Sequence, residues 1–198
     1  MKRAILLSGG QDSIALAALI RPSLAITVNY GQIAALGEMD AAAAVAAHFE
    51  IPHTILKADC AAVGSGDMAN SDSLRCSPTS DWWPYRNQLI ITLGASIALA
   101  HGMTSLAIAS VANDASHVDG RKEFFSALDQ LIQMQEGGLR IEAPAVEITS
   151  AELVRRSGIG LDVLAWAHSC HTGSTACGIC RGCNKHRDVL RDLGYDSY

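Results

Sequence analysis

Two glycines, two hydroxyls and one carboxylate follow an apolar run near the amino terminus, in the stretch AILLSGGQDSIALAALI. Adjacent glycines let a ligand approach main-chain N–H groups closely. A helix that begins near Asp12 adds its unpaired N–H groups and the positive end of its dipole. Ser8 and Ser13 supply hydroxyl groups. The segment therefore predicts a phosphate-binding loop, although Gly and Ser at a strand-to-helix turn can also serve only to turn and cap the chain.

This loop has no lysine, so it is not a Walker-type P-loop, which needs Gly-Lys-Ser/Thr. Ser-Gly-Gly-Gln-Asp-Ser instead resembles the SGGxDS loop of the N-type ATP pyrophosphatases, the PP-loop family. That resemblance implies an enzyme that adenylates its substrate and releases pyrophosphate. It implies that Asp12 is catalytic and that the loop binds ATP together with the pyrophosphate or its Mg²⁺, through Ser8, Gly9, Gly10, Gln11, Asp12 and Ser13.

Four of the six cysteines crowd together near the carboxyl terminus, with the spacing Cys-x6-Cys-x2-Cys-x2-Cys. Four thiolates match a closed tetrahedral structural Zn²⁺ site, which leaves no open position for chemistry. Gly178 and Gly182 suit the sharp turns of such a knuckle. The predicted zinc ligands are Cys170, Cys177, Cys180 and Cys183.

Other interpretations of this cysteine cluster stay open. An iron–sulfur cluster is the competing metal centre, and the cysteines could also be unligated. His168, His171 or His186 could replace one thiol. The remaining cysteines, Cys60 and Cys76, stand apart from the cluster.

The composition limits the class of protein. The chain has 198 residues, which suits one domain or one domain with a small appendage, and its hydrophobic content of 49% can fill a core. A formal charge of −5 argues against a strongly electrostatic nucleic-acid binder. No signal peptide and no apolar run long enough for a membrane span is visible. We therefore expect a cytoplasmic protein with no direct nucleic-acid or membrane partner.

Strand-like runs alternate with helix-like runs, which predicts α/β architecture with a parallel sheet and helices on both faces. Ligands of such sheets bind at the carboxyl ends of the strands, where the glycine loop lies. Residues 1–165 are expected to form this domain and 166–198 a zinc-binding segment packed on it. Strands are expected at 3–7, 23–28, 53–57, 105–109 and 142–145, and helices at 12–20, 33–49, 86–101, 122–135 and 150–156.

Residues 58–84 form a long irregular connection that ends in two adjacent tryptophans. Connections of this length inside a compact domain are usually functional or disordered. The tryptophans favour a lid that closes over a ligand, and a surface loop without function is the alternative.

Further motifs extend the resemblance over nearly the full length. The sequences NYGQ (29–32), PYRN (84–87) and W-x-H-S-C followed by C-G-x-C-x-x-C (166–183) resemble the QueC-like 7-cyano-7-deazaguanine synthase family of PP-loop enzymes. That resemblance implies an adenine nucleotide alpha-hydrolase-like, Rossmann-like five-stranded fold. It also implies that ATP and Mg²⁺ activate the carboxylate of 7-carboxy-7-deazaguanine as an acyl-adenylate. Ammonia then displaces AMP, and a second activation dehydrates the amide to the nitrile.

The resemblance also implies roles for residues outside the glycine loop. Arg86 could neutralise developing phosphate charge, as fixed cations do in phosphoryl chemistry. The predicted ATP-binding residues are Asn29, Tyr30 and Gly31; the substrate-binding residues are Arg86, Asn87, Asn113 and Asp114; and the catalytic residues are Asp12, Arg86, Asp119 and Arg121.

The segment 114–121 departs from the family pattern. The family reads D-x-S-G-Y-P-D-C-R where this chain reads DASHVDGR, and the acid of the family's Asp-Tyr-Gly-Gln is Asn29 here. The nitrogen nucleophile therefore stays open between ammonia, which we favour, and a protein amine, as in family relatives of antiviral defence systems. His117 is a possible general base for such an amine. A tRNA-thiolating PP-loop enzyme, a non-catalytic nucleotide-binding module and assembly as a homodimer are further possibilities.

Overall fold

The computed structural model describes residues 2–114 and 117–195. Ala115 and Ser116, which belong to the segment that departs from the family pattern, lie outside the described residues. Five strands form one parallel sheet in the order β3-β2-β1-β4-β5, which confirms the predicted fold class. The strands are β1 (Arg3–Leu6), β2 (Leu24–Asn29), β3 (His53–Lys57), β4 (Ser105–Ala107) and β5 (Arg140–Glu142).

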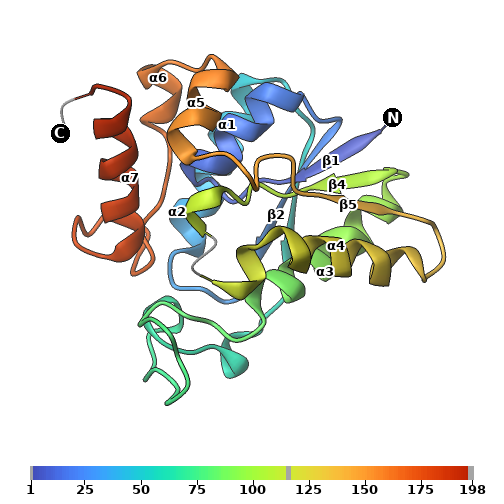
Figure 1. The fold of residues 1–198 in the computed structure, drawn as a ribbon, viewed down its shortest axis with the longest axis horizontal. Coiled ribbons are helices and arrows are strands. Elements are labelled where there is room, and N and C mark those ends of the chain that lie inside the picture. Colours follow the sequence, from blue (N-terminus) through green and yellow to red (C-terminus); the bar gives the residue numbers. More distant parts are fainter. Residues whose placement is uncertain (1, 115–116, 196–198) are drawn as a thin grey trace.

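Helices cover both faces of the sheet, because the central strands carry apolar side chains on both sides. Ile5 and Leu7 point into one core and Leu6 and Ile26 into the other. Figure 1 shows the two helical layers on opposite sides of the sheet. The first layer holds α1 (Gln11–Ile20), α2 (Ala35–His48), α5 (Ser150–Ser157), α6 (Leu161–Leu164) and α7 (Arg181–Asp192), and the second α3 (Arg86–Ala100) and α4 (Lys122–Gln133).

The chain changes direction across the sheet at β1. From β1 it passes through α1 to β2 on one side, whereas β4 pairs with the other side of β1. Open α/β sheets bind ligands at such a switch point, outside the carboxyl ends of the strands. The loops that follow β1 and β4 therefore meet in one crevice.

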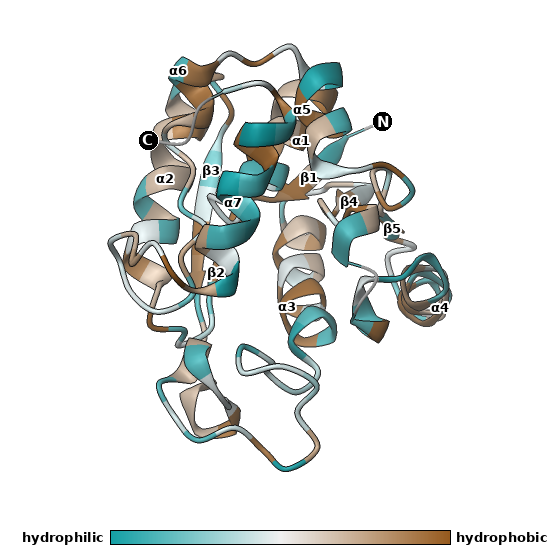
Figure 2. Cartoon of the chain, turned by 60° about the vertical axis from the view of Figure 1, so that its left-hand side comes forward, coloured by the Kyte–Doolittle hydropathy of each residue, from teal (hydrophilic) through white to brown (hydrophobic). Residues whose placement is uncertain are grey.

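Each of the five predicted helices is present, with ends within two residues of those expected. The last strand was predicted at 142–145, which is wrong: β5 ends at Glu142 because Pro144 has no N–H to donate to a neighbouring strand and 144–147 form a turn. The helices α6 and α7 were not predicted. Figure 2 shows α7 as mostly hydrophilic, and it buries only Gly182, Cys183, Val189 and Leu190, so few apolar residues mark it in the sequence.

The irregular segment between β3 and α3 lies away from the sheet, as the teal-to-green loop of Figure 1 shows. It contains short 3-10 turns at Ala61–Val63 and Asp67–Ala69. Its main anchor is Trp83, which is 2% exposed and packs edge-to-face on Tyr30 with ring centroids 5.0 Å apart. A buried aromatic side chain therefore fixes the end of the segment beside β2.

Within the described part of the chain, no helix combines the length and the apolar character that a membrane crossing requires.

Replacing Trp83 with Ala should release this anchor. Removing a buried tryptophan costs about 3–5 kcal/mol, and we expect the cost to fall mainly on docking of the segment, with faster cleavage between residues 58 and 85 in limited proteolysis. Trp166→Ala is the control, since Trp166 is 42% exposed and lies outside the segment. Equal cleavage rates in the parent and Trp83→Ala would contradict the anchoring role.

Candidate functional site

A cavity of about 540 Å³ lies at the carboxyl ends of the strands, where β1 and β4 end. Its volume falls within the range of small-molecule sites. Most of its lining comes from the glycine loop, the segment after β4, the end of the irregular segment with the start of α3, and the carboxyl-terminal segment; β2 and α2 contribute further residues. The site is therefore assembled from residues far apart in the sequence.

The glycine loop takes its shape from one residue with a left-handed backbone. Gly9 has φ +78°, and a Cβ at this position would overlap the Glu38 carbonyl oxygen and approach Ala41 Cβ to 3.0 Å. Ser8 Oγ donates to Ser13 Oγ at 3.2 Å, and Ser13 Oγ donates to the Gly10 carbonyl oxygen at 2.9 Å. No side chain caps the amino terminus of α1. Its first N–H groups remain available for an anion.

An ion-pair cluster joins the glycine loop to the segment after β4. Lys185 Nζ lies 2.8 Å from Asp12 Oδ2 and 2.6 Å from Asp114 Oδ1. Burial raises the pKa of Asp12, and the charge of Lys185 offsets part of that effect. Asp12 Oδ1 is buried, and no group of the described residues lies within hydrogen-bonding geometry of it. The cluster thus holds an unsatisfied acceptor at the start of α1.

A half-buried cation, Arg86, lies at another part of the cavity. Arg86 lines the cavity, and its Nη1 lies 3.0 Å from Met68 Sδ. Burial opposes its charge, but Tyr30, Asp119 and Glu38 surround it and raise the pKa of Arg86. Burial raises the pKa of Glu38, whose Oε2 accepts a 2.7 Å hydrogen bond from Gln32. Arg86 is therefore positioned to hold an anionic group of a ligand.

The irregular segment and the carboxyl-terminal segment meet at Asp81. Its carboxylate lies 3.1 Å from His171 Nδ1 and 3.5 Å from Arg181 Nη1. Burial disfavours the Asp81 carboxylate, but these neighbours outweigh it and lower the pKa of Asp81. Arg181 Nη1 also donates to His117 Nε2 at 2.7 Å. The general-base role predicted for His117 needs that lone pair, so it requires the contact with Arg181 to break.

The remaining predicted residues divide between the cavity wall and its surroundings. Asn87 Nδ2 donates to the Asp119 carbonyl oxygen at 3.0 Å, and Asn113 Oδ1 accepts from the Ser150 amide at 3.1 Å. The predicted residues Asn87, Asn113 and Asp119 all line the cavity. Tyr30 is buried and also lines it. Outside the lining lie Gly9, Asn29 and Gly31, which shape the loops, and Arg121, which is exposed at the start of α4.

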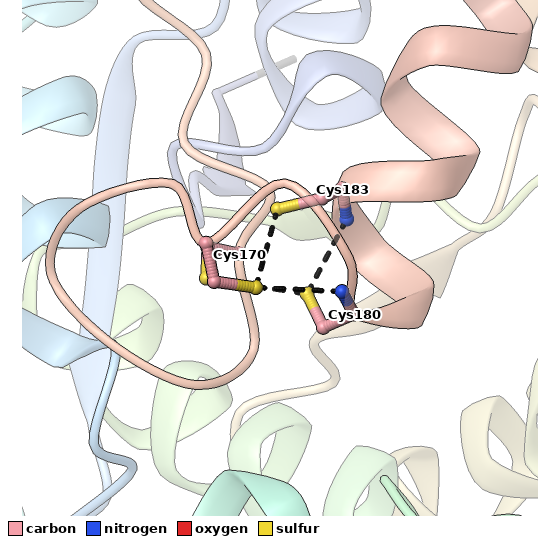
Figure 3. A group of neighbouring side chains, drawn as sticks. Cys170, Cys180 and Cys183 are labelled. Carbon is pink, nitrogen blue, oxygen red and sulfur yellow. Dashed lines mark hydrogen bonds between the residues drawn. The ribbon is translucent and has the colours of Figure 1, made fainter.

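The four predicted ligand cysteines come together. Their sulfur atoms all lie within 4.8 Å of one another, with 3.9 Å between Cys177 and Cys183 and 4.0 Å between Cys180 and Cys170. Figure 3 shows three of these thiols, those of Cys170, Cys180 and Cys183, converging beside the start of α7. Cys180 Sγ also accepts from the Cys183 amide at 3.4 Å and so caps α7. This group of thiols, which we call the cysteine knuckle, could hold a metal ion.

The histidines near the knuckle make other contacts. His168 Nε2 pairs with the Gly173 carbonyl oxygen and His186 Nδ1 with Gln11 Oε1, each at 2.9 Å. Within the described residues the knuckle contains only thiols. The turn role predicted for Gly178 fits its φ of +76°, but that for Gly182 is wrong: it lies in α7, where a Cβ would overlap the Ser169 carbonyl oxygen.

Sequence reasoning missed Lys185, Asp81 and Arg181 as cavity residues. Each reaches the cavity through a contact with a distant residue, and Lys185 is 173 positions from Asp12. A helix predicted to include the last cysteine would have placed Lys185 beside the knuckle, since α7 runs from Arg181 to Asp192.

Comparisons with known proteins agree on one family. The family model described as "Queuosine biosynthesis protein QueC" matches residues 2–194. The 7-cyano-7-deazaguanine synthase of Desulforudis audaxviator is 31% identical, with 98% of each chain covered. The same-named protein of Methanothermobacter thermautotrophicus is 28% identical over 99% of this chain and 97% of its own.

Among solved structures, the chain is similar to the U34-tRNA thiolase NcsA from Methanococcus maripaludis with its [4Fe-4S] cluster. The TM-score is 0.57 and the identity 18%, with 98% of this chain covered. This chain spans 65% of the thiolase chain. At this identity the similarity shows a shared fold.

The two glycines of the loop provide a matched test of its geometry. Gly9→Ala should lower the free energy of unfolding by about 2 kcal/mol, because Ala is strained at φ +78° and its Cβ meets backbone. Gly10→Ala should cost far less, since Gly10 has φ −75° and its nearest contact would be Ser8 Oγ at 3.5 Å. Urea denaturation measures both. A Gly10→Ala cost equal to or above that of Gly9→Ala would refute this account.

Proposed function

The chain belongs to the family of the queuosine biosynthesis protein QueC, and from that premise we propose that it is an ATP-dependent, carbon–nitrogen bond-forming ligase. Its proposed substrate is 7-carboxy-7-deazaguanine, as the names of the curated relatives support. One observation carries the proposal: a single cavity joins the uncapped start of α1 to the half-buried cation Arg86. An enzyme that joins ATP to an acidic substrate needs two sites for anionic groups, one for the polyphosphate and one for the substrate.

The irregular segment contributes to the part of the cavity where a flat substrate would bind. Trp82 and Trp83 line the cavity beside Arg86. The indole N–H of Trp83 is buried and has no acceptor. A buried donor without a partner is costly, and a carbonyl or ring nitrogen of a bound deazaguanine would satisfy it. This supports a heterocyclic acid as the substrate and a lid role for the segment.

In the first step, a substrate carboxylate oxygen attacks the α-phosphorus of ATP. The bond between the α-phosphorus and the bridging oxygen breaks, and pyrophosphate leaves. The amides at the start of α1 and the hydroxyls of Ser8 and Ser13 would hold the pyrophosphate. Arg86 would offset negative charge that develops on the phosphates. The acyl-adenylate that results carries AMP as a good leaving group.

Asp12 and Asp114 would hold the Mg²⁺ that accompanies ATP. Mg²⁺ prefers carboxylate and phosphate oxygens, and the buried Asp12 Oδ1 accepts no hydrogen bond from the described residues. When bound, the ion supplies positive charge to the phosphate oxygens. The residues present fit this group.

In the second step, a nitrogen lone pair attacks the acyl carbon, the bond to AMP breaks and the nitrogen loses a proton. We propose ammonia as this nucleophile. The amide oxygen would then attack the α-phosphorus of a second ATP, with release of pyrophosphate. Loss of AMP, which takes the oxygen, and of both N–H protons would leave the nitrile. A protein amine in place of ammonia would stop the reaction at the amide.

For the cysteine knuckle we propose a structural Zn²⁺ ion. Four sulfurs at about 2.3 Å from one zinc are about 3.8 Å apart, close to the 3.9 and 4.0 Å found here. In a four-iron cluster each thiolate binds a different iron atom, which holds the sulfurs further apart. The compact arrangement therefore supports one ion.

A thiolation function finds less support. A thiolating enzyme that handles sulfur on a free cysteine would place that cysteine at the reacting centre. Among the described residues no cysteine lines the cavity; Cys60 is half-buried elsewhere and Cys76 is exposed.

The reaction itself is the main test. Incubation of the chain with ATP, Mg²⁺ and 7-carboxy-7-deazaguanine should yield AMP and pyrophosphate, and ammonium should convert the deazaguanine to the nitrile, as mass spectrometry detects. Asp12→Asn should reduce AMP release about 100-fold or more, since one charge-assisted contact contributes about 1.5–3 kcal/mol and the ion site is lost as well. Asp40→Asn, at an exposed position of α2, is the control.

Three results would count against this function. AMP release at the parental rate by Asp12→Asn would show that the loop assignment is wrong. Pyrophosphate release with a different carboxylate, but none with the deazaguanine, would refute the substrate. If the deazaguanine became attached to a protein amine and ammonium gave no nitrile, the nucleophile would be the protein amine and not ammonia.

The metal proposal has its own test. Elemental analysis should find about one zinc per chain, and Cys180→Ser should lower zinc content and thermal stability, because metal-binding energy is partly folding energy. Cys76→Ser should change neither, since Cys76 is exposed and outside the knuckle. Stoichiometric iron in the parent would overturn the assignment to zinc.

A further inference from the structure

We propose that Lys185 supplies the phosphate-binding cation that the glycine loop lacks, and that it contacts the β- and γ-phosphates of ATP and the pyrophosphate product. The loop contains no lysine of its own, whereas a Walker-type loop carries one that reaches these phosphates. The inference rests on the proposed ATP site and adds a residue to it.

The position of Lys185 carries the inference. Its Nζ lies 2.8 Å from Asp12 Oδ2, and Asp12 is the second residue of α1. The uncapped N–H groups of α1 begin at the same place. Lys185 lines the cavity together with Ser8 and Ser13, and 33% of its side chain is exposed. A phosphate held by the start of α1 would therefore lie within reach of this ammonium group.

The charges around Lys185 are also suited to a polyphosphate. Asp12 and Asp114 would repel phosphate if they stood alone in the cavity. One ammonium group between two carboxylates leaves the cluster with a single negative charge when all three are ionised. That charge still attracts a divalent cation, so Lys185 and Mg²⁺ can act together on the phosphates.

The cysteine knuckle fixes where Lys185 can go. Cys180 caps α7 and Cys183 is buried in its first turn, two residues before Lys185. Val189 and Leu190 lie about one turn after Lys185, and their side chains are buried in the core to which α1 and α5 also contribute. The backbone of Lys185 is thus held at both ends, and only its flexible side chain has to move from a carboxylate to a phosphate.

A purely structural role is the competing explanation, in which the ion pairs only attach α7 to the sheet. The two roles differ in their dependence on the length of the phosphate chain. A cation for the β- and γ-phosphates affects ATP and pyrophosphate but not AMP. Loss of a structural contact disturbs the whole site and affects AMP as well.

Isothermal titration calorimetry with Mg²⁺ and with ATP, pyrophosphate or AMP separates these roles. Lys185→Met should weaken ATP and pyrophosphate binding by roughly 10- to 100-fold, the effect of one charge-assisted contact, and leave AMP binding within about twofold. Lys185→Arg should retain most of the affinity for ATP. Lys122→Met is the matched control, because Lys122 pairs with Glu147 at 2.9 Å on the surface, outside the cavity lining.

Lys185→Gln provides a second uncharged variant in case Lys185→Met does not fold. Equal weakening of all three ligands, or of none, in the folded uncharged variant would overturn the inference. Parental protein that binds neither ATP nor pyrophosphate would overturn the ATP site and the role of Lys185 with it. The uncharged variant could lose affinity for ATP and pyrophosphate but not for AMP, while the parental protein leaves 7-carboxy-7-deazaguanine unchanged. That result would support the role of Lys185 and refute the proposed substrate.

Discussion

The pairing of β4 with the free side of β1 is the constraint on which the site depends. It places the loops after these two strands side by side at one edge of the sheet. Asp12 and Asp114 are brought together only by this pairing, and Lys185 can bridge them only because they are adjacent. A sheet in which β4 paired with β3 would keep every motif of the sequence and would separate the two carboxylates. The strand order therefore determines which side chains can meet in the cavity.

Much of this arrangement could be predicted from the sequence. The glycine loop and the four cysteines have spacings that only a few structures satisfy. The helices α1, α2 and α3 are runs rich in alanine and leucine, and α4 and α5 each have an apolar face. The limits of prediction have physical causes. Pro144 ended β5 early because a residue without an N–H cannot extend the ladder. The polar helix α7 depends on its cap at Cys180 and buries only four residues, so its low apolar content concealed it in the sequence.

Long-range charge pairs were the least predictable part of the site. Buried charges are costly unless they are paired, and in this cavity the partners come from different segments. Asp81 of the irregular segment meets Arg181 of α7, and Asp12 of α1 meets Lys185 of the same helix. No local sequence pattern records such pairs. These ion pairs form because each segment carries a charged side chain that has its partner of opposite charge on another segment.

The cysteine knuckle therefore has a larger role than that of a distant structural support. It caps α7, and α7 presents Arg181 to the irregular segment and Lys185 to the glycine loop. His171, the residue after Cys170, faces Asp81 as well. A shift of the knuckle would move charges at both parts of the cavity at once, although no thiol lies in the described cavity lining. In the proposed enzyme this links the zinc site to the phosphate loop: the segment that carries the thiols also holds the cations that the loop does not have.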